Sequence, residues 1–310
     1  MPVRSPELRL DPIHDRAVVI APKRNIRPHD IPDPYVRTVR PQQCPFCPES
    51  IKGKHPTAHL GRGKNLIRAI ANDYPAVSLK TPKAYGYQEV IIDTPDHDAD
   101  LGELSVTQLD HLLSFYQLRT KAIARIPNIE YILIFKNHGG KSGASLVHAH
   151  SQVFATGFVP PHIVLKLQNV RQYKLEHGHC YYCKLLADEK KGPRRILSNK
   201  YVTAFAPYAS AYPYEVWLFP NRHLDNCTRL SLVERRAFAA ALQSILKKLN
   251  LIRASYNYYL HQTLTDQDEH FYLRIAPREQ TWGGVEVGSR LVINGVAPED
   301  AAKFFRKGIR

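Results

Sequence analysis

The stretch of sequence that decides the fold is YILIFKNHGGKSGASLVHAHSQ, residues 131–152. It begins with an apolar run, Tyr131–Phe135, which is typical of a buried strand. A loop rich in glycine and other small residues follows, and glycine allows a phosphate group to lie close to the backbone. The stretch ends in His-x-His-x-Gln. If these last residues form a strand, His148, His150 and Gln152 point to one face; the alternative is a turn with core histidines.

An internal repeat extends this pattern to the rest of the chain. Each copy contains, in the same order, a C-x-x-C pair, a strand, a strand that ends near a His, a helix, and a strand with a further His. The helices are expected over residues 104–126 and 230–251. Both begin with a capping box, formed by Ser105 with Gln108 and by Ser231 with Glu234. The sequence therefore predicts an α+β chain of two tandem histidine-triad-like units, each an antiparallel sheet with packed helices.

The repeat also predicts how the chain is divided. We expect a first unit over residues 1–158, a linker helix over 159–179 with a proline-stiffened start, and a second unit over 180–310. The first copy keeps both histidines of the triplet. Tyr272 stands at the second of these positions in the other copy. We therefore expect the first unit to be catalytic and the second to be catalytically silent.

Two sets of cysteines and histidines have the composition of metal sites. Each C-x-x-C pair is followed by two His at matching positions of the repeat, and two S and two N ligands complete the tetrahedron of a closed, structural zinc site. A redox role for the C-x-x-C pairs is the alternative. The predicted ligand sets are Cys44, Cys47, His97 and His148, and Cys180, Cys183, His223 and His270. With His148 on zinc, the backbone beside His150 is fixed, and the His148 carbonyl could orient the His150 ring.

Composition narrows the class of protein. The formal net charge is +15, so the surface attracts anions, either phosphorylated small molecules or nucleic acid. The sequence contains no nucleic-acid-binding signature, and we do not expect a nucleic-acid partner. No apolar run is long enough to span a bilayer and the N-terminus lacks a signal-peptide pattern, so we expect no membrane contact and a cytoplasmic location. The cysteine pattern also suits metal binding better than a secreted disulfide framework.

The motifs closely resemble the galactose-1-phosphate uridylyltransferase family of the histidine-triad superfamily over nearly the whole chain. The resemblance implies a ping-pong nucleotidyl transfer from UDP-glucose to galactose 1-phosphate through a uridylyl group on His150, in a homodimer. Gln152 would bond a phosphoryl oxygen. The substrate-binding residues that the resemblance implies are Arg24 and Arg27 for phosphates, Asn72 and Asp73 for the ribose, Asn137, Gly143 and Ser145 for the phosphate loop, and Glu286 for sugar hydroxyls.

Gln152 carries an inference of its own. A third His could protonate a leaving group and later activate water, whereas Gln cannot. A sugar phosphate leaves without a proton, so Gln152 favours transfer to phosphate over hydrolysis.

Three departures from the family pattern bear on the substrate. Cys180-x-x-Cys183 resembles the branch that contains ADP-glucose phosphorylase, Lys166 lies near the place of a metal-ligating Glu, and Val285 replaces an aromatic residue of the sugar-recognition segment. We therefore keep a nucleotide-sugar phosphorylase as the alternative to a hexose-1-phosphate uridylyltransferase. A zinc-stabilised nucleic-acid-binding module is a third hypothesis, which leaves the His-x-His-x-Gln triplet unexplained.

Overall fold

The computed structural model describes residues 5–26, 43–51, 55–264 and 268–307. Ten of the described strands form one sheet with the order β3-β4-β5-β7-β6-β11-β12-β10-β9-β8. The N-terminal strands of this sheet are β3 (Ala58–Leu60), β4 (Ile67–Ala71), β5 (Gly86–Ile92), β6 (Tyr131–His138) and β7 (His150–Thr156). The C-terminal strands are β8 (Arg195–Ser198), β9 (Val202–Phe205), β10 (Val216–Pro220), β11 (Tyr256–His261) and β12 (Tyr272–Pro277). All the pairings within this sheet are antiparallel.

The strand order has the same pattern in both halves, which confirms the predicted pair of α+β units. β5, β7 and β6 of the first half correspond to β10, β12 and β11 of the second, and the central pairing of β6 with β11 fuses the halves into one sheet. β7 begins at His150 and β12 begins at Tyr272, so both strands begin at corresponding positions of the repeat. The division of the chain at residues 158 and 180 stays a prediction.

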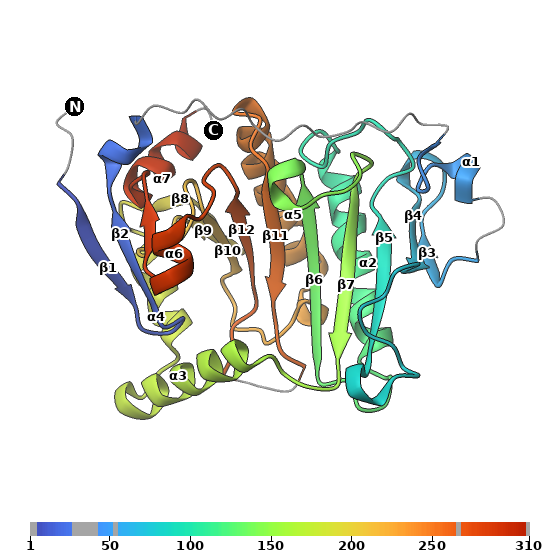
Figure 1. The fold of residues 1–310 in the computed structure, drawn as a ribbon, viewed down its shortest axis with the longest axis horizontal. Helices are drawn as coiled ribbons and strands as arrows, with labels where there is room; N and C mark the ends of the chain where they lie inside the picture. Colours follow the sequence, from blue (N-terminus) through green and yellow to red (C-terminus); the bar gives the residue numbers. More distant parts are fainter. Residues whose placement is uncertain (1–4, 27–42, 52–54, 265–267, 308–310) are drawn as a thin grey trace.

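Two long helices cover one face of the sheet (Figure 1). They are α2 (Val106–Ile123) and α5 (Leu232–Leu251), which pack against each other. Their N-caps are Ser105 and Ser231, each with the capping box that the sequence predicts. Alternate residues of β7, such as Val153 and Ala155, are fully buried beneath the helices, as the period of two requires. The opposite face of the sheet is therefore left for His150 and Gln152.

Apart from α7 (Pro298–Arg306), which contributes to the same core as α2 and α5, the remaining elements lie around that opposite face. A second, three-stranded sheet joins β1 (Glu7–Asp11), β2 (Arg16–Ile20) and β13 (Val292–Asn294), and Figure 1 shows it in front of the large sheet. The shorter helices are α1 (Pro48–Ile51), α3 (Pro161–His177), α4 (Tyr181–Glu189), α6 (Gly284–Ser289) and α7 (Pro298–Arg306). α3 lies within the segment expected to be a linker helix. None of the described helices is both long and apolar enough to cross a membrane.

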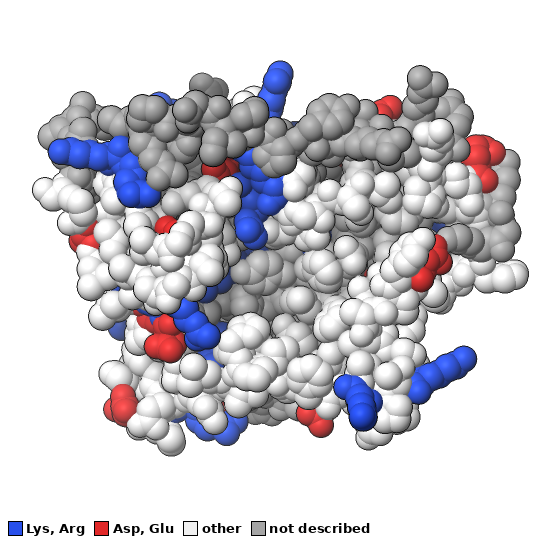
Figure 2. Space-filling view, in the orientation of Figure 1, with Lys and Arg blue, Asp and Glu red and all other residues white. Residues whose placement is uncertain are grey.

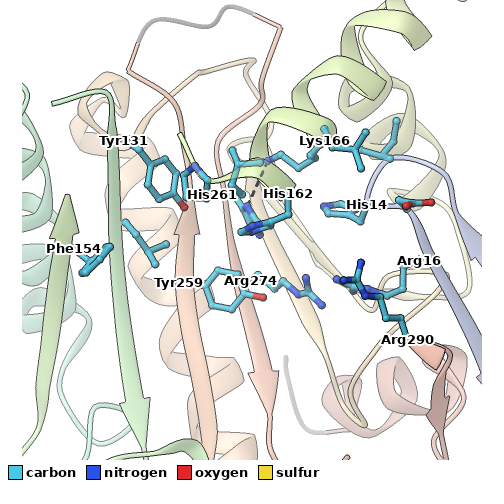
Figure 3. A pocket seen from close by; sticks show the side chains of 16 residues that line it. His14, Arg16, Tyr131, Phe154, His162, Lys166, Tyr259, His261, Arg274 and Arg290 are labelled. Carbon is cyan, nitrogen blue, oxygen red and sulfur yellow. Dashed lines mark hydrogen bonds between the residues drawn. The ribbon is translucent and has the colours of Figure 1, made fainter. Parts of the chain in front are cut away.

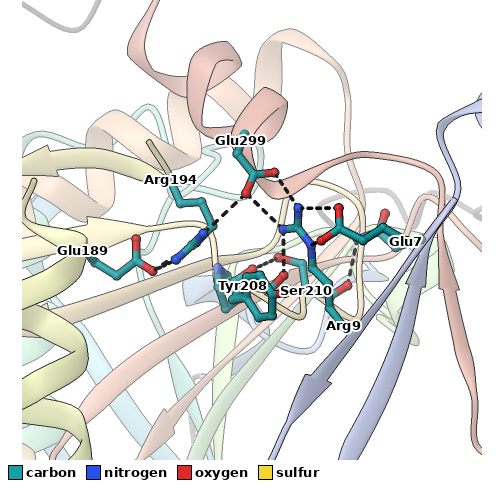
Figure 4. Close-up of polar contacts among 9 residues, drawn as sticks. Glu7, Arg9, Glu189, Arg194, Tyr208, Ser210 and Glu299 are labelled. Atoms are coloured by element: carbon teal, nitrogen blue, oxygen red, sulfur yellow. Dashed lines mark hydrogen bonds and ion pairs between the residues drawn. The ribbon is translucent and has the colours of Figure 1, made fainter. Parts of the chain in front are cut away.

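A network of charges connects the three-stranded sheet to α7 and α4 (Figure 4). Arg9 on β1 donates to Glu299 on α7 at 3.0 Å, and Glu299 also accepts from Arg194 at 3.4 Å. Arg194 in turn pairs with Glu189 at the end of α4. Because Arg9 is only 5 % exposed, its guanidinium needs these carboxylates to compensate for lost hydration. The network thus fixes β1 against the C-terminal half.

Candidate functional site

His150 lies at the first position of β7, on the face that α2 and α5 leave uncovered. Its Nδ1–H donates to the carbonyl oxygen of His148 at 2.8 Å, the bond anticipated from the sequence. This bond fixes the tautomer, so Nε2 carries the free lone pair. Burial, aided by the charge of Lys136, lowers the pKa of His150 to about 4. The ring is therefore neutral at pH 7.

His148 lies just before the strand rather than within it. Its ring nevertheless lies on the same side of the sheet as that of His150. Both rings contact Phe46, with centroid distances of 6.2 Å for His148 and 5.0 Å for His150. The Nε2–H of His148 donates to the Thr94 carbonyl at 2.8 Å. Its Nδ1 is thereby left free to ligate, which is the usual arrangement of a metal-binding histidine with its second nitrogen fixed.

The first predicted metal set comes together beside this pair. Ligand atoms of Cys44, Cys47, His97 and His148 all lie within 4.8 Å of one another. Cys47 Sγ lies 3.3 Å from His97 Nδ1 and 3.6 Å from His148 Nδ1. Two thiols and two imidazoles that converge in this way fit the donor set of a tetrahedral zinc ion.

The second predicted set is brought together in part. Cys180, Cys183 and His223 form the other described group whose ligand atoms lie within 4.8 Å of one another, with Cys183 Sγ 3.3 Å from His223 Nδ1. His270 is not within that group, but its ring centroid lies 4.9 Å from that of His223. Its Nδ1 bonds the Phe271 carbonyl, and its buried Nε2 has no hydrogen-bond partner among the described residues. That orphaned nitrogen suits a fourth ligand.

A buried polar network lies beneath His150, on the helix side of the sheet. Lys136 donates to Asp93 at 2.9 Å and to the His150 carbonyl at 2.9 Å. Ser151 also donates to Asp93, at 2.9 Å, and the Asp93 N–H donates to the Ala149 carbonyl. The sequence analysis missed these residues. The sequence does contain a signal for Lys136: it continues the alternation of Ile132 and Ile134, which places it on the inward face of β6.

Asn137, the first of the three expected phosphate-loop residues, lies on β6, which pairs with β7. Gln152 pairs with Phe135 across β6 and β7, and continuing this register by two residues places Asn137 beside His150. Asn137 Oδ1 accepts from Asn257 Nδ2 at 2.7 Å, and the same amide donates to the Ser142 carbonyl at 2.9 Å. Asn257, a further residue that the sequence analysis missed, thereby anchors the loop to β11. The backbone φ of Gly143 is +83° and a Cβ there would meet nothing within 4 Å, so the loop is open on that side.

The other expected binding residues lie on several separate elements of the chain. Asn72 and Asp73 follow β4, and Asn72 Oδ1 accepts from the Tyr74 N–H. Ser145 and Arg24 are exposed, whereas Arg27 lies outside the described residues. Glu286 is 6 % exposed and accepts from the Gly283 N–H at 2.9 Å, as part of the cap of α6. One of its oxygens is therefore engaged within the protein.

Comparison with known proteins identifies the family. Residues 3–160 match the family model described as galactose-1-phosphate uridyl transferase, N-terminal domain. The chain is 32% identical to ADP-glucose phosphorylase from Arabidopsis thaliana, with 98% of this chain and 93% of that protein covered. It is 28% identical to galactose-1-phosphate uridylyltransferase from Thermotoga maritima, with coverages of 97% and 98%. The chain belongs to the galactose-1-phosphate uridyl transferase family.

A solved structure of a family member agrees over almost the whole length. The crystal structure of ADP-glucose phosphorylase from Arabidopsis thaliana with bound ADP-glucose superposes with a TM-score of 0.85 at 31% identity, covering 98% of this chain and 99% of that one. As a member of the family, this protein is an enzyme, either a nucleotidyltransferase or a phosphorylase.

Lys166 is one of the three residues at which the sequence analysis found a departure from the family pattern. In the structure it forms a buried ion pair with Glu269 at 2.9 Å.

Proposed function

We propose that this enzyme transfers a nucleotidyl group from a nucleotide sugar to a phosphate acceptor in two displacements, through His150. The observation that carries the proposal is the 2.8 Å bond from His150 Nδ1 to the His148 carbonyl. It leaves the Nε2 lone pair on the uncovered face of the sheet. A covalent intermediate replaces one difficult displacement by two easier ones.

In the first displacement, His150 Nε2 attacks the α-phosphorus of the nucleotide sugar. The new bond joins Nε2 to phosphorus, and the bond from phosphorus to the bridging oxygen breaks. The sugar 1-phosphate leaves with that electron pair and needs no proton. The ring becomes cationic as the bond forms, and the His148 carbonyl that already accepts from Nδ1 stabilises this charge.

In the second displacement, an oxygen of the acceptor phosphate attacks the same phosphorus and the N–P bond breaks. His150 returns to its neutral form, again without a proton transfer. Gln152 would donate its amide N–H to a phosphoryl oxygen, and Asn137 with the loop around Gly143 and Ser145 would hold the phosphates. Asn72 and Asp73 would bind the ribose, and Arg24 and Arg27 would add positive charge.

Among possible substrates, we infer ADP-glucose as donor and inorganic phosphate as acceptor. The Arabidopsis relative named for this phosphorolysis is 32% identical over 98% of the chain. The products would be ADP and glucose 1-phosphate.

The second candidate is the uridylyl transfer that the sequence analysis put first, from UDP-glucose to galactose 1-phosphate. It is supported by the family model and by the Thermotoga relative, which aligns over 97% of this chain. The two candidates share every step at His150 and differ in the nucleoside and in the acceptor.

We also propose that both cysteine–histidine sets hold zinc and that the enzyme is a homodimer in the cytoplasm. Zinc held by Cys44, Cys47, His97 and His148 would be a closed structural site that stabilises the fold. His148 would then be fixed at Nδ1 by zinc and at Nε2 by Thr94. Its carbonyl would be a rigid acceptor for His150.

The experiment that tests the function is labelling without acceptor. The enzyme is incubated with ADP-glucose or UDP-glucose carrying ³²P at the α-phosphate, and the protein is then separated. We expect acid-labile label on wild type and on His59→Asn, an exposed control, and none on His150→Asn. Discharge of the label by inorganic phosphate with release of ADP supports phosphorolysis, and discharge by galactose 1-phosphate alone supports the second candidate. Absence of label with both donors contradicts the covalent route.

A further inference from the structure

A cavity lies on the same face of the sheet as His150, but at the opposite end of the central strands β7, β6 and β11. Its volume is about 490 Å³, within the range of small-molecule sites. Side chains from β6, β7, β11 and β12 form its floor, and the β1–β2 turn, α3 and the end of α6 form its walls. The residues that the argument uses are Arg16, Tyr131, Phe154, Tyr259, Arg274 and Arg290.

This cavity adjoins the position in the second unit that corresponds to His150. Tyr272 begins β12 as His150 begins β7, and its OH lies 3.0 Å from Nε2 of His14, a lining residue. The ring of His261, which also lines the cavity, stacks on Tyr272 at 4.3 Å. Burial raises the pKa of Tyr272 well above its usual value, so the phenol stays protonated and is a poor nucleophile. The location suits binding without transfer.

The cavity has an excess of positive charge. Arg16, Lys166, Arg274 and Arg290 line it, and Asp15 is the one carboxylate among the described lining residues. Two of these cations have carboxylate partners that do not line the cavity: Lys166 pairs with Glu269 at 2.9 Å, and Arg274 pairs with Glu215 at 2.7 Å. Figure 3 shows Arg16, Arg274 and Arg290 extending toward one another. Lys and Arg side chains also lie along a hollow in the middle of this face in Figure 2.

Some of these donors are buried without an acceptor. Arg274 is 3 % exposed, yet its Nη2 has no hydrogen-bond partner among the described residues. The same holds for the buried Nη1 of Arg16 and for Nε2 of His261, which is 8 % exposed. A buried polar group without a partner destabilises the fold, because it has lost its hydrogen bonds to water. An anion held between the guanidinium groups would satisfy these donors and offset their mutual repulsion.

The other end of the cavity is apolar and aromatic. Tyr131 and Leu133 on β6, Phe154 on β7, and Ile163 and Leu165 on α3 line it. Figure 3 shows Tyr131 and Phe154 on the side away from Arg290, with Tyr259 between them and the arginines. A ligand that fits both ends carries a phosphate at one end and a planar, partly apolar body at the other.

We propose that this cavity is a second, non-catalytic binding site for a nucleoside phosphate. The phosphate lies among Arg16, Arg274 and Arg290, and the base lies against Tyr131, Phe154 and Tyr259. The proposal does not depend on transfer at His150. It assigns to the second unit a ligand-binding role in place of the catalytic role that it lacks.

Trp217 makes the site observable. It is 3 % exposed, its ring lies 5.1 Å from that of His14 and 6.0 Å from the Arg274 guanidinium, and the only other Trp of the chain is Trp282. In a Trp282→Phe background, the fluorescence emission of Trp217 therefore reports on this cavity and not on the surroundings of His150.

The titration uses AMP, adenosine and inorganic phosphate as probes. We expect a saturable change with AMP, and binding at least about tenfold weaker for adenosine and for phosphate, since each fills one end only.

The variants separate this site from the catalytic one. Arg16→Gln and Arg290→Gln are each expected to weaken AMP binding about tenfold or more, whereas Arg62→Gln, a surface control, and His150→Asn leave the titration unchanged. If Trp282→Phe does not fold, titration calorimetry of the unmodified chain takes the place of the fluorescence measurement. We expect two AMP molecules to bind per chain, and one to bind in each of the two arginine variants. An unchanged Trp217 emission at millimolar AMP, equal affinity for AMP and phosphate, or loss of the signal in His150→Asn would each overturn the proposal.

Discussion

The Lys136 ammonium lies 2.9 Å from the Asp93 carboxylate and 2.9 Å from the carbonyl oxygen of His150. Both side chains are almost fully buried, at 2 and 4 % exposure. An ion pair at such a depth is costly to form and costlier to break, because either charge alone would be desolvated without compensation. The pair therefore ties the backbone of the proposed nucleophile to β6 and to the residue that follows β5.

Substitution of Lys136 by Met should destabilise the protein strongly. Among the described residues, the change leaves buried Asp93 with Ser151 as its one side-chain donor, and we expect a loss of about 3–5 kcal/mol in the free energy of unfolding. Urea denaturation measures it. The matched variant is Lys136→Met with Asp93→Leu, which removes both charges and should recover most of the loss. A single variant as stable as wild type would show that the pair contributes little.

Replacement of His150 by Asn should abolish nucleotidyl transfer without unfolding the protein. Loss of a covalent nucleophile costs roughly a millionfold in rate in a well-studied hydrolase, so we expect activity at the background of the assay. Circular dichroism and metal content should match wild type. Substantial turnover by this variant would mean that another group attacks the phosphorus.

Replacement of His148 by Ala should remove metal and stability together. His148 contacts both Cys44 and Cys47 through Nδ1, and a structural zinc ion contributes its binding energy to folding. We expect one metal ion fewer per chain by elemental analysis and a lower melting temperature. His59→Ala, at an exposed position, should change neither quantity. Cys183→Ser should remove the other ion and leave activity at His150 largely intact. Unchanged metal content in His148→Ala would contradict the ligand assignment.

The protein should lose stability as the pH falls from about 6.5 to about 4. Burial lowers the pKa of His14 from 6.5 to about 4 despite the neighbouring Asp11, and the side chain is 7 % exposed. In that window the unfolded chain binds a proton at His14 that the folded protein does not, so unfolding is favoured as the pH falls. This difference in the pKa of His14 changes the free energy of unfolding by roughly 3 kcal/mol across the window.

Denaturant titrations at a series of pH values check this expectation. His14→Gln cannot titrate and should flatten the dependence in that window, whereas His59→Gln, at an exposed position, should not. Asp11 acts in a lower window: its pKa is lowered to about 2, so its stabilising effect is lost only as the pH falls from about 4 toward 2. An identical slope in wild type and His14→Gln would mean that His14 does not titrate as described.

The sequence by itself determined the architecture and most of the cysteine and histidine groups that the fold brings together. Repeated motifs at constant order predicted two α+β units, and the capping boxes at Ser105 and Ser231 placed the long helices to within a few residues. Cys and His at matching positions predicted the metal sets. These inferences succeed because they rest on local periodicity, capping chemistry and residue identity, which the chain carries wherever it folds.

Only the tertiary structure decided which distant groups support that centre. The fusion of the units through β6 and β11, the pairing of Lys136 with Asp93 and the anchoring of the loop by Asn257 each join residues that are far apart in sequence. The cavity around Arg16, Arg274 and Arg290 likewise draws on three separate segments. Strand register and sheet closure set these contacts, and both depend on how the whole core packs, so no local pattern in the chain could specify them.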